Sequence, residues 1–238
     1  MALNSKILVP GCSLPGAIPL TENHVHTTFS DGRNTVEEYV NAALQQGIKS
    51  MVFTEHVNRG CPWFDDYINE IKRVRRKYVR HIEVYAGIEA KTLDFNGSID
   101  ATREMMAACD VVVGVVHRCP DPAGGMLEYT ELDGSTAQYL EYRAAKGLLE
   151  KGDIHILGHM GGMHEYFYGP FPDPLYLSLI RIAHKKGCAV ELNGRHHPRL
   201  SKLVAYCRRY NPWVSLGSDA HDTGEIGLIH RRLKELNI

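Results

Sequence analysis

Histidines and acidic residues stand at the ends of several short apolar runs in this chain. The residues in such positions, drawn from a total of 13 histidines and 28 acids, are His24, His26, His56, Glu89, His117, His159, Asp219 and His221. Imidazole nitrogens and carboxylate oxygens are ligands for zinc, manganese and iron. A single histidine there is commonly a hydrogen-bonded structural residue, but burying several together is costly unless a cation coordinates them. The pattern therefore predicts a divalent metal site and a metal-dependent hydrolase.

The apolar runs themselves predict strands that alternate with helices. We expect seven strands, at 21–26, 50–56, 82–90, 111–117, 154–160, 189–194 and 213–220. Helices are expected at 34–47, 65–80, 99–108, 135–151, 174–186, 199–210 and 224–236. The first of them should begin with Asn34 as its N-cap and Glu37 three residues later.

Helical connections imply that neighbouring strands run parallel. Because the chain has no dinucleotide-binding fingerprint, seven such units fit a closed barrel better than a doubly wound sheet. The expected fold is α/β, a (β/α)7 barrel with parallel strands in a single domain. This domain should cover residues 20–238 and follow an N-terminal extension of residues 1–19.

In β/α barrels the active site lies at the carboxyl ends of the strands, so its ligands appear as the last residues of successive strands. The histidines and acids of this chain have that distribution. Side chains alternate along a strand, so His24 and His26 share one face, and Asp219 and His221 do the same. We therefore expect these residues to meet at one mouth of the barrel.

The motifs around these positions resemble those of the PHP (polymerase and histidinol phosphatase) family. They are His24-Val25-His26-Thr27-Thr28-Phe29-Ser30-Asp31-Gly32, Thr54-Glu55-His56, Gly87-Ile88-Glu89, the strand-end His117, Gly158-His159 and Gly217-Ser218-Asp219-Ala220-His221. The resemblance extends from about residue 20 to 222. It implies a distorted seven-stranded barrel that holds up to three metal ions through nine ligands, each of which has a matching residue here.

By this resemblance, the nine ligands divide among three ions. The first ion would be held by His24, His26, Glu89 and Asp219; the second by Glu89, His117 and His159; the third by Asp31, His56 and His221. Members of the family use zinc, manganese or iron. A mixed imidazole and carboxylate set suits several of these metals, so we expect two or three divalent ions of open identity.

Divalent ions a few ångströms apart suit phosphoester hydrolysis by a metal-bridging hydroxide. The resemblance favours a small phosphorylated substrate, a phosphomonoester of the histidinol phosphate type. His221 is a candidate proton donor to the leaving group, and a metal-bound water is the other. Arg195, which shares the parity of Asn193, and Arg118, directly after His117, could bind phosphate, or each could form a surface salt bridge.

Substrate choice should depend on two long loops, 118–134 and 161–174. The second loop is rich in aromatic residues, which could form a lid that stacks on a ring of the substrate or could pack to close the barrel. Histidines 196 and 197 follow Arg195, and we expect neither to be a ligand.

Rival functions remain open. A nuclease or nucleotide phosphatase, a phosphatase acting on tyrosine phosphate, and an amidohydrolase-type enzyme that cleaves C–N bonds would all use related sites. A binding module stabilised by metal would leave the nine ligands without a chemical purpose.

Net charge, the length of the apolar runs and the cysteine spacing argue against some partners and locations. The formal net charge of −1 offers no general attraction for nucleic acid or anionic membranes, so a long nucleic acid is not the expected partner. The apolar run at 111–116 is far shorter than the roughly 18 to 20 residues that span a bilayer. The six cysteines form no C-x-x-C pair, which favours reduced thiols and a cytoplasmic enzyme without membrane contact. No oligomeric state is indicated.

Overall fold

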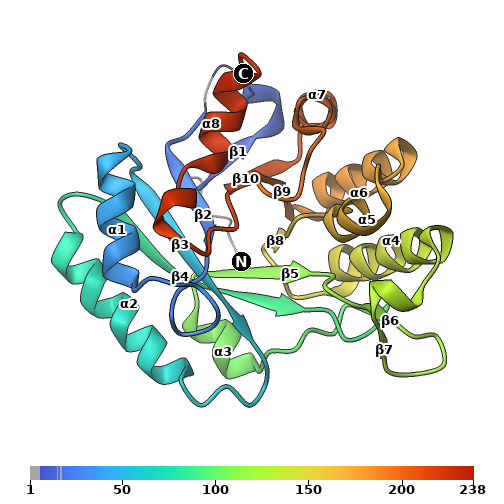
Figure 1. The fold of residues 1–238 in the computed structure, drawn as a ribbon, viewed down its shortest axis with the longest axis horizontal. Coiled ribbons are helices and arrows are strands. Elements are labelled where there is room, and N and C mark those ends of the chain that lie inside the picture. The colour runs from blue at the N-terminus through green and yellow to red at the C-terminus, as the bar shows by residue number, and fades with distance from the viewer. Residues whose placement is uncertain (1–5, 15, 17) are drawn as a thin grey trace.

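Eight strands form one curled sheet in a computed structural model that describes residues 6–14, 16 and 18–238 (Figure 1). Their order is β1-β10-β9-β8-β5-β4-β3-β2. The strands are β1 (Leu8–Pro10), β2 (Thr21–Val25), β3 (Ser50–Val57), β4 (Glu83–Lys91), β5 (Val111–Val115), β8 (Ile156–Leu157), β9 (Ala189–Asn193) and β10 (Trp213–Gly217). All strands from β2 to β10 in this sheet are parallel, and they correspond to the seven strands predicted from the sequence.

The parallel strands close into a distorted barrel at their carboxyl ends. Val25 forms a parallel bridge with Ala220, where the backbone N–H of His26 donates to Ala220 O and that of Ala220 donates to His24 O. Distortion arises because β8 has only two residues and the register of β2 shifts between Glu22 and Val25. The expected α/β fold class is confirmed.

Helices surround this sheet, with α1 and α2 on one side and α4 to α7 on the other (Figure 1). They are α1 (Val36–Gln45), α2 (Phe64–Tyr78), α3 (Arg103–Ala108), α4 (Gly134–Lys151), α5 (Gly162–Tyr168), α6 (Asp173–Lys186), α7 (Leu200–Tyr210) and α8 (Leu228–Glu235). Helix α5 lies in a segment that we expected to be a loop, and the other long loop contains a small hairpin of β6 (Cys119–Pro120) and β7 (Met126–Leu127). Within the described part of the chain, no helix combines the length and apolar character needed to cross a bilayer.

The predicted N-cap of the first helix is wrong by one residue. Thr35 is the N-cap: its Oγ1 accepts a hydrogen bond from Glu38 N, and the Glu38 carboxylate accepts one from Thr35 N. Asn34 instead accepts a hydrogen bond from the backbone N–H of Thr223 through its Oδ1. The capping box therefore exists as expected, but it is shifted by one residue because a distant loop uses Asn34.

The first described residues add an eighth strand to the sheet. β1 pairs antiparallel with β10, and Ile7 O accepts a hydrogen bond from the side-chain amide of Asn23 at 2.7 Å. Ile7 and Leu8 are buried against Val111 and Ala189, which begin β5 and β9. The barrel interior is thus filled at its amino end, opposite the end where the polar strand-end residues gather.

One buried acid, Glu141 of α4, connects this helix to α5. Its Oε2 accepts hydrogen bonds from Tyr129 Oη and from the backbone N–H of His164, both at 2.8 Å. Burial raises the pKa of Glu141 to about 7. A carboxyl group in this position therefore keeps its proton to a higher pH in the folded protein than in the unfolded chain.

This raised pKa predicts a pH-dependent stability. Between the ordinary glutamate value of 4.5 and about 7, the folded state binds one proton more than the unfolded state, so the free energy of unfolding falls as the pH rises through this window. The loss should be on the order of 3 kcal/mol. Glu141→Gln should remove it, as measured by urea unfolding of both proteins at pH 5 and pH 8. Equal changes in the two proteins would contradict the prediction.

Candidate metal centre

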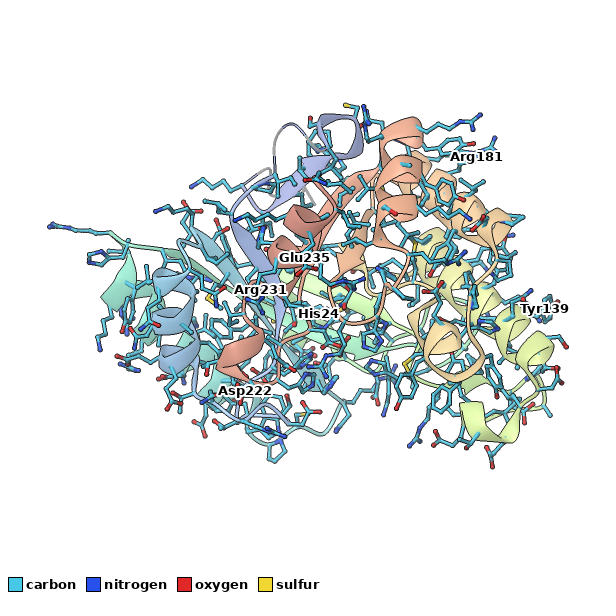
Figure 2. The ribbon with its side chains drawn as sticks, turned by 45° about the horizontal axis from the view of Figure 1, so that its top comes forward. His24, Tyr139, Arg181, Asp222, Arg231 and Glu235 are labelled. Atoms are coloured by element: carbon cyan, nitrogen blue, oxygen red, sulfur yellow. The ribbon has the colours of Figure 1, made fainter. Side chains whose placement is uncertain are left out.

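The nine residues predicted as metal ligands all lie at the carboxyl end of the barrel. They come from β2 and its following loop (His24, His26, Asp31), from β3 (His56) and β4 (Glu89), and from the segments after β5 (His117), β8 (His159) and β10 (Asp219, His221). In Figure 2, His24 lies inside the molecule, whereas Tyr139 and Arg181 extend from outer helices. Strand periodicity has thus placed these side chains in a common interior space.

Glu89 lies at the centre of this cluster, and its side chain is almost fully buried. Its two oxygens face five imidazoles. Oε1 lies 3.1 Å from His24 Nε2, 3.1 Å from His159 Nε2 and 3.6 Å from His117 Nε2, while Oε2 lies 2.6 Å from His56 Nδ1 and 3.8 Å from His26 Nε2. A carboxylate with both oxygens among ring nitrogens has the placement of a ligand shared between two cations.

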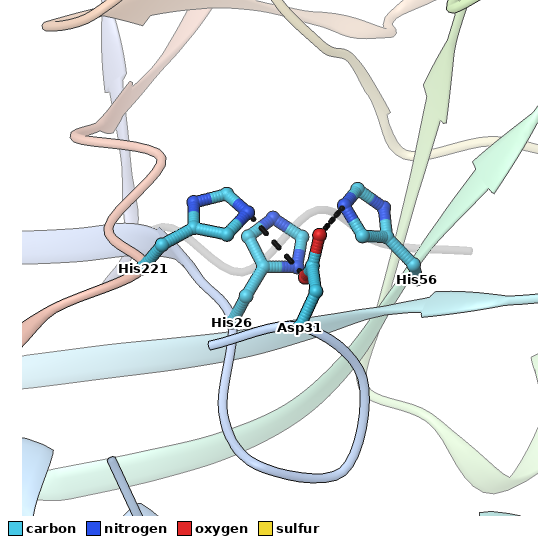
Figure 3. Close-up of side chains that lie close together, drawn as sticks. All are labelled: His26, Asp31, His56 and His221. Atoms are coloured by element: carbon cyan, nitrogen blue, oxygen red, sulfur yellow. Dashed lines mark ion pairs between the residues drawn. The ribbon is translucent and has the colours of Figure 1, made fainter. Parts of the chain in front are cut away.

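Asp31 organises an outer group that is more exposed to solvent (Figure 3). Its Oδ1 lies 3.4 Å from His221 Nε2, and its Oδ2 lies 3.4 Å from His56 Nε2. The ring of His26 lies between these two histidines, stacked on them with centroid distances of 4.2 Å to His56 and 4.4 Å to His221. These four residues offer ligand atoms that all lie within 4.8 Å of one another.

The loop that carries Asp31 is held in place by a buried acid. The carboxylate of Glu55 accepts hydrogen bonds from Thr27 N at 3.0 Å and from Ser30 Oγ at 2.6 Å. The loop also passes so close to β2 that a Cβ at Gly32 would lie 1.9 Å from His26 O. Glycine is therefore required at position 32, and the motif from His24 to Gly32 is compact for a steric reason.

Asp219 closes the cluster from the other side of the barrel. Its Oδ1 lies 3.1 Å from His26 Nε2, and its Oδ2 lies 2.9 Å from His196 Nε2. Its backbone has φ = 54°, a left-handed conformation that most residues avoid and that directs its side chain toward His26 and His196. His196, to which we had assigned no ligand role, thus contacts the site through Asp219.

Several ring nitrogens and a carboxylate oxygen of the cluster are buried without a well-directed hydrogen bond, although Glu89 Oε2 lies only 2.6 Å from His56 Nδ1. Among the described residues these atoms include His24 Nε2, both ring nitrogens of His26 and Glu89 Oε2. Buried polar atoms in native proteins nearly always have partners, and a convergent set of lone pairs is satisfied when a cation binds between them. The donor set and its unpartnered atoms therefore fit divalent metal ions.

Two opposing effects set the pKa values of the histidines in the cluster: burial lowers them, and the nearby carboxylates raise them. Burial lowers the pKa of His26 to about 4 and that of His117 to about 3, which favours the neutral rings that bind metals. His56 is partly buried, which opposes its charged form, but Glu89 and Asp31 raise its pKa to about 10. The surrounding histidines hold the pKa of Glu89 well below its usual range despite its burial. The carboxylates thus strongly favour positive charge in this space.

A cavity of about 940 Å³ opens onto the cluster. Besides predicted ligands, its walls include the three cationic side chains Lys91, Arg118 and Arg195, together with Tyr166. Arg195 forms an ion pair with Glu225 at 2.6 Å, and Arg118 forms one with Glu128 at 2.8 Å. Each arginine therefore lines the cavity and also makes a salt bridge, so the two alternatives posed by the sequence coexist.

The aromatic segment after β8 is mostly packed. Phe171 is fully buried, and Tyr168 Oη donates a hydrogen bond to Leu132 O. Tyr166 differs from them, because it lines the cavity and is 76% exposed. Packing accounts for most of these aromatic residues, and Tyr166 is the most exposed of them, with its ring in edge contact with that of Phe167.

Glu191 is a further residue of the site that sequence reasoning did not assign. Its carboxylate is buried in β9 and contacts His24 Nδ1 at 2.8 Å. Although burial opposes ionisation, His24 and His159 lower the pKa of Glu191 to about 2. The sequence signal for a role of Glu191 was the presence of an acidic residue within the otherwise apolar run 189–192.

Comparisons with known proteins show which family and which relatives this chain is similar to. Residues 22–195 match the PHP domain. A protein of Deinococcus radiodurans, described as a probable histidinol-phosphatase, is 28% identical over 235 residues, which cover 87% of this chain and 88% of that protein.

Solved structures with the same fold include two histidinol phosphatases. That of Lactococcus lactis, a complex with zinc, L-histidinol and phosphate, has a TM-score of 0.68 and 20% identity over 90% of this chain and 92% of its own. That of Listeria monocytogenes, described as putative, has a TM-score of 0.70 and 17% identity over 87% of this chain and 97% of its own.

Proposed function

The chain belongs to the PHP domain family, and from this premise we propose that it is a metal-dependent phosphoesterase that hydrolyses a small phosphomonoester of the histidinol phosphate type. The observation that carries the proposal is the shared position of Glu89. Its two carboxylate oxygens lie among the ring nitrogens of five histidines, several of which are buried without hydrogen bonds. Such a cluster is costly to bury without cations and suits two or more of them.

We propose that the nine predicted ligands hold two or three divalent ions. His24, His26, Glu89 and Asp219 would hold one, Glu89, His117 and His159 a second, and Asp31, His56 and His221 a third. The spatial groups support shared ligands, because His26 lies within reach of both Asp31 and Asp219, and His56 within reach of both Asp31 and Glu89. Zinc, manganese and iron all suit such a ligand set.

The negative charge of the cluster supports the binding of more than one divalent ion. Among the described residues, four carboxylates lie within 4 Å of the ring nitrogens of the predicted histidine ligands: Asp31, Glu89, Glu191 and Asp219. With neutral imidazoles they carry four negative charges, which two divalent ions would balance. When bound, such ions coordinate phosphate oxygens and lower the pKa of water, which allows hydrolysis near neutral pH.

The protein's own side chains would orient the substrate. Arg195 and Arg118 line the cavity, and Arg195 Nε lies 3.9 Å from Asp219 Oδ2, so its guanidinium is placed to bind a phosphate next to the cluster. In the reaction, the oxygen of water bonds to phosphorus as the ester P–O bond breaks; the water gives up one proton, and the leaving alcohol takes up one. His221, on the cavity wall, is our candidate proton donor when two ions are bound and the third position is empty, because a ring nitrogen that holds a metal has no proton to give.

The substrate class rests on the size of the cavity and on the relatives. A volume of about 940 Å³ accommodates a small molecule. The Deinococcus radiodurans relative is described as a probable histidinol-phosphatase, and the Lactococcus lactis structure holds L-histidinol with phosphate. The exposed ring of Tyr166 at the cavity mouth could stack on a planar group such as an imidazole.

The test is a metal analysis combined with an activity screen on the same preparation. We expect two or three metal ions per chain and turnover of phosphomonoesters, including histidinol phosphate, but not of phosphodiesters or amides. A metal-free protein would refute the proposal. Turnover of diesters alone would favour a nuclease, and turnover of amides alone would favour a C–N hydrolase.

Glu89→Gln and His56→Ala should differ in the number of ions they affect. Because Glu89 faces five imidazoles, its neutral amide analogue should lower the occupancy of two ions. His56→Ala should chiefly lower that of one. Metal content after dialysis, measured by inductively coupled plasma mass spectrometry, distinguishes these outcomes. Equal losses in the two variants would show that Glu89 is not shared.

Arg195→Ala should weaken substrate binding more than it affects folding. A charge-assisted hydrogen bond contributes about 1.5–3 kcal/mol, so we expect KM for the phosphomonoester to rise at least about tenfold. Arg181→Ala is the matched control, because Arg181 extends from α6 on the outside of the molecule (Figure 2). If the kinetics of the Arg195 variant equal those of the control, Arg195 has no role in the site.

A further inference from the structure

Glu191 connects two predicted metal ligands that come from different strands. Its side chain is buried in β9, where Oε1 lies 2.8 Å from His24 Nδ1 and Oε2 accepts a hydrogen bond from the backbone N–H of His159 at 2.7 Å. His24 belongs to β2 and His159 follows β8. One carboxylate therefore reaches to both sides of β9, and each of its oxygens has its own partner.

A glycine in the neighbouring strand β10 leaves the space that this carboxylate occupies. A Cβ at Gly217 would lie 2.1 Å from Glu191 Oε1 and 2.6 Å from His24 Cβ. The close approach of Glu191 to His24 is thus possible only because β10 carries no side chain at position 217.

In the neutral ring that binds a metal, the contact determines which nitrogen of His24 carries the proton. An ionised carboxylate only accepts hydrogen bonds, so the His24 ring must donate from Nδ1. The opposite nitrogen, Nε2, is buried without a hydrogen bond and lies 3.1 Å from Glu89 and 3.6 Å from Asp219. The lone pair used to bind a metal is then on the nitrogen that faces the cluster.

We propose that Glu191 is a positioning residue of the metal centre, which holds His24 in its metal-binding tautomer and fixes the backbone of His159. This inference rests on the proposed function, because it presupposes that the cluster binds metal. A carboxylate behind a ligating histidine commonly contributes a factor of 10 to 100 in metal affinity.

Glu191→Gln tests the tautomer directly. The backbone N–H of His159 can only donate, so the amide oxygen of Gln must face it, and the amide NH₂ must then face His24 Nδ1. Nδ1 becomes an acceptor, and the proton moves to Nε2, where it blocks the metal. We expect zinc affinity for one ion, measured by competition with a chelator, to fall about 10- to 100-fold. The metal-free variant should unfold no earlier in urea than the metal-free wild-type protein.

Glu141→Gln is the matched control. Glu141 is also a buried carboxylate that accepts from a backbone N–H, but a single oxygen, Oε2, accepts from both Tyr129 Oη and His164 N. The amide oxygen of Gln can do the same, and no predicted ligand side chain is involved. Zinc affinity should therefore stay at the wild-type value.

The possible results separate the two proposals. Unchanged affinity in folded Glu191→Gln, an equal loss in Glu141→Gln, or earlier unfolding of the metal-free Glu191 variant would overturn the positioning role alone. A wild-type protein that binds no zinc would overturn the proposed function and this inference with it. If the Glu191 variant does not fold, long-range ¹H–¹⁵N spectra of zinc-loaded wild-type protein decide, with His24→Gln used for assignment. A proton on His24 Nδ1 supports the positioning role, and one on Nε2 refutes it.

Discussion

The crowding of carboxylates at the carboxyl end of the barrel is the constraint on which the rest of the site depends. Glu89 and Asp219 are buried among histidines, and Glu191 lies directly behind His24. Such groups repel one another and lose hydration, so they require positive charge and firm hydrogen bonds. The tight loop held by Glu55 and the left-handed backbone of Asp219 both serve this requirement, because they direct side chains toward the shared space.

Much of the fold could be predicted because strand periodicity is a local property. All seven parallel strands follow from short apolar runs, and the polar residues that end them follow from the same pattern. The sequence pattern did not determine which of two neighbouring residues of similar chemistry takes a given structural role. Asn34 and Thr35 can both cap a helix, and a contact with Thr223, far along the chain, decides between them. Helix α5 was missed because its short segment lies between glycines and prolines that predict a loop.

The positions of the predicted ligands followed from the sequence where the residue ends its strand, and residues that act through another residue were less predictable. Glu191 lies inside a strand. Its role depends on its contact with His24 and on the absence of a side chain at Gly217, and both residues are distant from it in sequence. His196 reaches the site only through the position of Asp219. The distribution of ions among the ligands also depends on side-chain rotamers, which a pattern of residue types does not specify.

The junction between β2 and β10 has a consequence for how the protein is made. Ala220 forms two backbone hydrogen bonds, one with His24 and one with His26, so segments nearly 200 residues apart meet where the predicted ligands converge. Contacts of such long range form late, because most of the chain must be ordered before they bring any gain. A chain still emerging from the ribosome therefore lacks Asp219 and His221 and holds only part of the centre. The proposed hydrolysis therefore requires that β10 has been synthesised and has joined β2.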